Sequence, residues 1–211
     1  MRTPDDFLRA KSAVHRGGDG TRMPPINRRP LSPCQTVPQI HERLRTGAKT
    51  IVIDHRGEDP LELTDAELVD GITIRIVGVS RVMITRLAPE TKRSAQIVAT
   101  DAARAQIFGH TTLFAYGNAH TDAFDTTRVR ATNRATNNLV DDSYGEVGED
   151  TTTYAYDNAT VHSYDQAAVH ATDRVSLVHH SSTPAEVEHG VTVFGPARNN
   201  IRLRPKDARA E

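Results

Sequence analysis

Four aspartates that stand sixteen residues apart are the first candidates for chemistry: Asp125, Asp141, Asp157 and Asp173. Carboxylates stacked about 5 Å apart raise one another's pKa or recruit a cation. A row of carboxylate oxygens is also a ligand set that suits Ca²⁺. Aspartate is equally a favoured residue at tight turns. We favour the turn interpretation, so we expect no metal ion and no cofactor, and these four residues form the alternative metal site.

Two pairs of neighbouring acids, Asp141-Asp142 and Glu149-Asp150, are the candidates for catalysis. Cleavage of a glycan requires two carboxyl groups that flank one groove. These four residues would be catalytic if the chain were an enzyme, whereas surface acids in a loop are the simpler explanation. The sequence contains no Gly-rich phosphate loop, no G-x-S-x-G motif and no Cys/His pair with a family signature.

The histidines are the third group whose side chains could do chemistry. His162 and His170 occupy equivalent outward positions of a repeat. In a coil with two sides they point to opposite faces, whereas a zinc site needs three or four converging ligands. We therefore expect no zinc site at these histidines.

An eight-residue repeat, clearest in residues 153–177, must position all of these side chains. No insertion breaks its frame from Ile97 to Leu203. Each unit offers apolar or small residues at i and i+2, which share one face of a strand, followed by Gly, Asp or Asn, which close tight corners. Strands this short bury their faces only by stacking. The repeat therefore predicts an all-β parallel β-helix (β-solenoid) of octapeptide strand-turn units.

The size of the inward residues indicates how many octapeptides form one coil. Every second unit carries Ile97, Leu113, Val129, Gly145, Val161, Leu177 or Val193 at its first inward position, whereas the units between carry mostly small or polar residues. Large residues on one wall would then meet small ones on the other. This pattern predicts about 16 residues per coil and a stack of about seven coils, ~34 Å long. A 24-residue coil is the alternative, and residues 133–151, where Asn137 and Gly145 replace core residues, could bulge.

The chain divides into five segments: a basic, mostly irregular arm (1–35), a capping helix (36–48), irregular wider coils (49–96), the regular repeat (97–203) and a polar tail (204–211). Thr36 to Gln39 match a capping box, so a helix over 37–46 is expected, ended by Gly47. Its apolar face would cover the open end of the stack. Residues 88–96 are expected to be a loop where the frame shifts by one.

Two resemblances follow from these motifs. The order helix, Gly47, first strand resembles the N-terminal end of pectate-lyase-like right-handed parallel β-helices. The repeat wording in Ala155–Val161, AYDNATV, and around Tyr116 looks like the octapeptide arrays of actinobacterial, phage and other bacterial proteins. The second resemblance implies a repeat class whose members mostly lack an assigned function.

Composition bounds the function further. A net charge of −1 gives no overall electrostatic case for nucleic acid. The sequence has no apolar run long enough to span a membrane and no N-terminal apolar signal core. We therefore expect a cytoplasmic or virion-associated protein without a membrane span. The lone Cys34 cannot form an intrachain disulfide.

These observations lead to two functional hypotheses. The first is a non-enzymatic structural or binding protein that presents a rigid solenoid, as a component of a phage particle or similar assembly. Its expected partners are a protein bound by the N-terminal arm and a second copy bound through the C-terminal edge of the solenoid. The alternative is a glycan-acting lyase or hydrolase that uses acids of residues 137–150.

Overall fold

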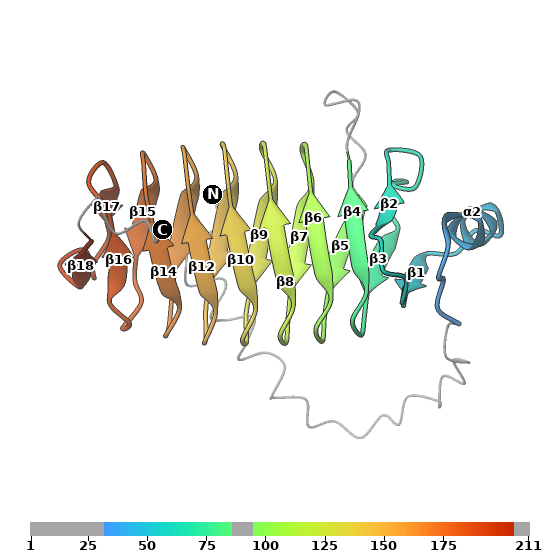
Figure 1. Ribbon diagram of the computed structural model, residues 1–211, viewed down its shortest axis with the longest axis horizontal. Coiled ribbons are helices and arrows are strands. Elements are labelled where there is room, and N and C mark those ends of the chain that lie inside the picture. Colours follow the sequence, from blue (N-terminus) through green and yellow to red (C-terminus); the bar gives the residue numbers. More distant parts are fainter. Residues whose placement is uncertain (1–31, 86–94, 205–211) are drawn as a thin grey trace, which may run out of the picture. The chain divides into compact units, whose positions relative to one another are not determined.

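The computed structural model describes residues 32–85 and 95–204. The expectations for most of the arm, most of the 88–96 loop and all but the first residue of the tail lie outside these residues. In the described part, the chain winds into two parallel sheets that lie back to back, with one helix at the end where the first strands lie (Figure 1). The predicted all-β parallel β-solenoid is confirmed.

Each sheet holds nine strands among the described residues, and consecutive strands alternate between the sheets. Sheet A consists of β1 (Thr50–Ile53), β3 (Thr73–Ile76), β5 (Gln96–Ala99), β7 (Thr112–Ala115), β9 (Arg128–Ala131), β11 (Tyr144–Val147), β13 (Thr160–Ser163), β15 (Ser176–His179) and β17 (Thr192–Phe194). Sheet B consists of β2 (Leu61–Leu63), β4 (Arg81–Ile84), β6 (Arg104–Ile107), β8 (His120–Ala123), β10 (Thr136–Leu139), β12 (Thr152–Ala155), β14 (Ala168–Ala171), β16 (Ala185–Val187) and β18 (Ile201–Leu203).

The strand register confirms that two octapeptides form one coil. Val161 pairs with Gly145 on one side and with Leu177 on the other. The first coils are wider than two octapeptides, because Thr50 pairs with Thr73 and Thr73 pairs with Gln96. From Gln96, which pairs with Thr112, each coil takes two octapeptides.

The core is the narrow layer between the two sheets. Sheet A contributes the large residues of the first inward position, which are buried from Ile97 to Leu177, and sheet B faces them with smaller buried ones such as Ala105 and Thr121. From β5 to β15, the residue directly before each strand also points inward and is buried, which the sequence pattern did not reveal. Most of these residues are alanine, threonine or serine, among them Ala103, Ala119, Ala135, Ala159, Ala167, Thr127 and Ser143.

Residues 133–151 keep the regular register and do not bulge. Asn137 is fully buried and lies in a polar row inside the core, where Thr121 donates to its Oδ1 (2.9 Å) and its Nδ2 donates to Thr153 (3.3 Å). Leu139 fills the space beside Gly145. A Cβ added to Gly145 would lie only 2.5 Å from Leu139 Cδ1, so this position accommodates no larger residue without a shift of Leu139. Both apparent defects in the repeat are therefore compensated inside the core.

The helix α2 (Val37–Arg45) packs on the first coil and buries Ile40 completely. The expected capping box is wrong, because the Thr36 side chain makes no capping bond; Gln39 Oε1 instead accepts the Gln35 N–H at 2.7 Å. Gly47, with φ of +77°, follows the helix end as expected. The strand edge of β1 is also covered, because Cys34 bridges to Ile53 in parallel.

A buried carboxylate fastens α2 to the loop after β2. Glu67 is only 3% exposed, and its Oε2 accepts the N–H and the hydroxyl of Thr64 at 2.7 and 3.0 Å. Its Oε1 pairs with Nε2 of His41, which lies on α2. Burial pushes the pKa of Glu67 upward, but the hydrogen bonds from Thr64 and His41 outweigh burial and hold it below its ordinary value.

Candidate functional sites

The four aspartates of the candidate metal column lie at the corners between sheet B and sheet A. All four have left-handed backbone, with φ between +56° and +60°. Their side chains serve the corners, since Asp125 accepts the Gly109 N–H at 2.8 Å and Asp141 accepts the Asp125 N–H at 3.2 Å. In the part of the chain that the structure describes, no group of three or more His, Cys, Asp or Glu residues could hold a metal ion.

The corners on the opposite edge use the same arrangement. Gly117 donates its N–H to Asn133, Asn133 to Glu149, and Glu149 to Asp165, at 3.4, 2.9 and 3.2 Å. Each side chain thus satisfies a backbone donor one coil earlier in the stack. The spacing of sixteen residues between corner acids is the sequence signal for this role.

The two pairs of candidate catalytic acids do not come together. Asp141-Asp142 precede β11, and Glu149-Asp150 follow it. The four residues of β11 therefore separate the pairs by roughly 13 Å or more along the strand. Carboxyl pairs that cleave glycosidic bonds lie about 5–9.5 Å apart, so these four residues do not form such a pair across β11.

A cluster that the sequence reasoning missed lies on the outer face of sheet A. Tyr144 donates its hydroxyl to Glu146 at 3.0 Å, and Arg130 pairs with the other oxygen of Glu146 at 3.0 Å. The ring of Tyr144 packs against His162, with centroids 5.3 Å apart. Burial, followed by the charge of Glu146, raises the pKa of Tyr144 far above its ordinary value, so this phenol stays protonated and acts as a donor. These groups satisfy one another, which makes the cluster a cross-strand contact.

The histidines occupy the predicted faces. His162 lies on β13 of sheet A and His170 on β14 of sheet B, so they do not converge. His179 points inward instead and is fully buried, with Nδ1 2.8 Å from the hydroxyl of Ser163. By hydrogen-bond geometry its Nε2 has no partner among the described residues, although backbone groups of Thr183 and Asn200 act on the ring and favour its protonated form. Burial lowers the pKa of His179 and that of His162 below their ordinary values.

From the lowered pKa values of His179 and His162 we expect the free energy of unfolding to fall in mild acid. Above about pH 6.5, the unfolded histidine is neutral and no penalty exists. Below that pH, the unfolded chain binds protons that the folded chain does not, so the free energy of unfolding falls until the folded-state pKa is reached. The slope is at most about 1.4 kcal/mol per pH unit for one proton.

Urea unfolding between pH 7.5 and 5 measures this slope. His179→Asn keeps a hydrogen-bonding group beside Ser163 and cannot titrate, so it is expected to flatten the slope, whereas His189→Asn, at an exposed position, leaves it unchanged. An identical pH slope in both variants would show that His179 does not carry the effect.

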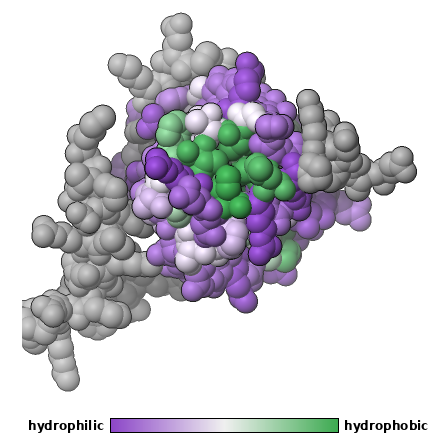
Figure 2. Space-filling model, turned by 90° about the vertical axis from the view of Figure 1, so that its left-hand side faces the viewer, coloured by the Kyte–Doolittle hydropathy of each residue, from purple (hydrophilic) through white to green (hydrophobic). Residues whose placement is uncertain are grey.

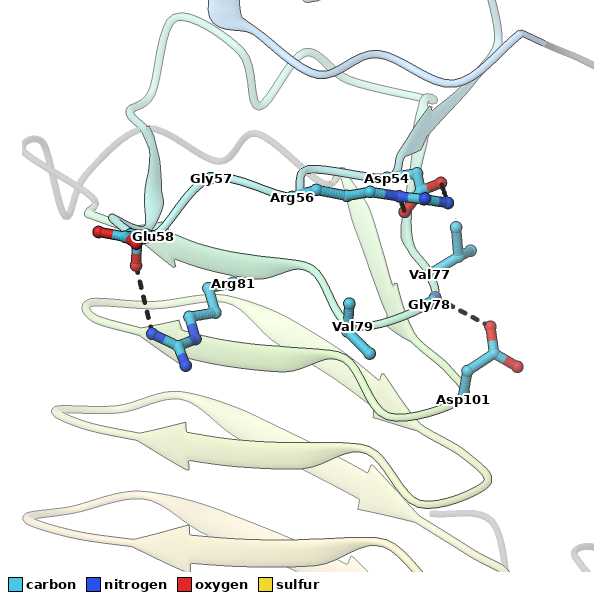
Figure 3. A pocket seen from close by; sticks show the side chains of 9 residues that line it. All are labelled: Asp54, Arg56, Gly57, Glu58, Val77, Gly78, Val79, Arg81 and Asp101. Carbon is cyan, nitrogen blue, oxygen red and sulfur yellow. Dashed lines mark hydrogen bonds and ion pairs between the residues drawn. The ribbon is translucent and has the colours of Figure 1, made fainter.

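A groove lies beside the wider coils, where a loop after β1 faces the turn between β3 and β4 (Figure 3). Four of its charged side chains bond to other residues of the groove wall. Arg56 pairs with Asp54 at 3.0 Å, Arg81 donates to the Glu58 carbonyl at 3.2 Å, and Asp101 accepts the Gly78 N–H at 3.1 Å. The groove therefore presents one ion pair, two charged side chains bonded to main-chain groups, and the exposed Val79 side chain, and we assign it no ligand.

The end of the stack formed by β17 and β18 differs from the end beneath α2. Both strands are edge strands among the described residues. Leu203 is 73% exposed, and Val191, Val193 and Ile201 are only partly buried, although their register places all four on the inward side of the last coil. Phe194 is 51% exposed and lies on the outer face of sheet A, in register with Val178. Figure 2 views this end and shows an apolar patch surrounded by hydrophilic residues. We call Val191, Val193, Ile201 and Leu203 the end patch.

Comparison with known proteins gives no match: no family model, no curated protein and no solved structure matches the chain. In the described part of the chain, no helix is long and apolar enough to cross a membrane.

Proposed function

We propose that this protein is a structural or binding protein that presents a rigid solenoid and docks through the end patch. The observation that carries the proposal is the exposed Leu203 side chain, together with the partly buried Val193 and Ile201, on the two edge strands at the same end of the stack. Edge strands present rows of backbone N–H and C=O groups that pair readily with another chain. Solenoids cap such ends or pair them.

The rest of the structure supports a role in which the surface is the functional part. The side chains on the outer faces are engaged with one another along the rod, as in the row of Gln106, Asp122 and Asn138, where both amides donate to Asp122 at 3.3 and 2.6 Å. Such contacts fix the shape of these outer faces. Asp141, Asp142, Glu149 and Asp150 do not line the groove beside the wider coils, whose acids are Asp54, Glu58 and Asp101, so they give the glycan-acting alternative no support.

The biological context is part of the proposal. The octapeptide wording resembles repeat arrays of phage and bacterial proteins, so a component of a phage particle or similar assembly is the setting that we propose. In that setting the basic N-terminal arm, which lies almost entirely outside the described residues, would bind a protein partner.

The mass of the protein in solution tests docking through the end patch. We expect size-exclusion chromatography with light scattering at about 100 μM to give a mass above that of one chain. Leu203→Lys places a charge in the end patch and is expected to return the mass to one chain. Val79→Lys is the matched control, because Val79 is also exposed (65%) but lies in the groove. A single-chain mass for the unsubstituted protein at this concentration would count against self-association.

A further inference from the structure

The two ends of the stack differ in a way that limits how copies can associate. At the first end, α2 buries Ile40 and the segment at Cys34 occupies the edge of β1. At the other end, nothing in the described part of the chain covers β17 and β18. Head-to-tail stacking would need two open ends on each copy, so an end-to-end contact must join two open ends and closes at two copies.

We propose that the end patch binds the end patch of a second copy, in a two-fold dimer that joins β17 of each copy to β18 of the other. This inference rests on the proposed function, because it names the partner of the same surface. The joined strands would continue both sheets across the interface, and the two narrow cores would meet.

Strand direction allows this pairing. Consecutive strands lie in opposite sheets and are joined by tight corners, so β17 and β18 run in opposite directions. A two-fold axis parallel to the strands brings β17 beside β18 of the second copy as an antiparallel pair. The inward faces of both strands then point to the same core.

Charge separates this axis from the other possible one. A two-fold axis perpendicular to the sheets would pair β18 with itself and set Arg202 opposite Arg202 of the second copy. Like charges directly opposite each other across strands are destabilising. The axis parallel to the strands avoids this contact, because Arg202 then faces β17, which carries no charge.

The apolar pattern sets the register of the new pair. Val193 on β17 and Val191 just before it lie on the inward side. Ile201 and Leu203 on β18 lie on the inward side too, in register with the buried Ala185 and Val187. Val193 opposite Ile201 and Val191 opposite Leu203 match all four apolar side chains on the buried face. In this register the exposed Thr192 lies opposite the exposed Arg202 of the second copy.

Cysteine cross-linking tests the arrangement. The variant with both Thr192→Cys and Arg202→Cys is expected to form a covalent two-chain species under mild oxidation, and each single variant is not. Both positions are exposed, and the native Cys34 is buried, so only the new thiols are accessible. Light scattering of the unsubstituted chain over a range of concentrations is expected to reach the mass of two chains and stop there.

Three outcomes of these experiments would contradict different parts of the proposal. A single-chain mass at all concentrations would overturn both the dimer and self-association as the function. A mass that keeps growing with concentration would overturn the closed dimer but leave docking intact. A covalent dimer of the Arg202→Cys single variant would show that β18 pairs with itself, which contradicts the axis proposed.

Discussion

Val161→Asp is expected to destabilise the solenoid by about 4 kcal/mol or more, because it places a charge without a partner in a fully buried position. Val161 lies in the middle of β13 and stacks between Gly145 and Leu177. The core is one layer of side chains thick between the two sheets, so the carboxylate cannot reach water without separating strands. Urea unfolding followed by far-UV circular dichroism measures the loss.

The matched control for this variant is Val178→Asp, since Val178 has the same side chain and lies on β15 of the same sheet, pointing outward in register with His162. We expect it to cost about 1 kcal/mol or less. Equal losses in the two variants would contradict the inward orientation of Val161.

Glu67→Ala is expected to cost about 2–4 kcal/mol, because it leaves the N–H and the hydroxyl of Thr64 without their acceptor in a partly buried setting and empties the buried site of the carboxylate. It also removes the contact of His41 that holds α2 on the first coil. Urea unfolding measures the cost, and Glu62→Ala, at an exposed position of β2, is the control, with an expected change within about 0.5 kcal/mol.

The lowered pKa of Glu67 adds a pH signature. Its contribution is present above the unfolded value of about 4.3 and is lost as the pH falls through the folded pKa. The Ala variant is therefore expected to lose less stability than the parent protein between pH 5 and 3. A parallel loss in both proteins would show that the fold does not lower the pKa of Glu67.

The octapeptide frame predicted most of this architecture from spacing alone. The separation of large residues on one wall from small ones on the other predicted a coil of two octapeptides, and the register of Val161 confirms it. This prediction was possible because stacked coils bring equivalent residues into contact, so residues that pack together recur at a fixed spacing in the sequence.

Other features were not readable from the period. Asn137 and Gly145 appeared as defects, since their compensation comes from Thr121 and Leu139, which lie on other strands. The prediction of a capping box at Thr36 was wrong, because the Gln39 side chain accepts the N–H of Gln35, the residue before Thr36. The contact of Tyr144 with Glu146 and His162 depends on side-chain orientations across neighbouring coils, which a list of inward positions does not supply.

For the candidate sites, too, the sequence predicted the role of the residues but not their hydrogen-bond partners. The corner role of Asp125 and Asp141 was the favoured interpretation, because Asp adopts left-handed backbone readily, and their φ values agree with it. The backbone donor that each side chain accepts lies one coil away and became visible only in three dimensions.

Hydrogen exchange of the unsubstituted protein, measured at high and at low concentration, tests docking through the end patch most directly. If the end patch docks, the amides of residues 191–203 are expected to exchange more slowly at about 100 μM than at about 1 μM. The amides of β1 and α2, at the covered end, should exchange equally at both concentrations. Protection that does not change with concentration in residues 191–203, or that changes only at the end beneath α2, would contradict the account.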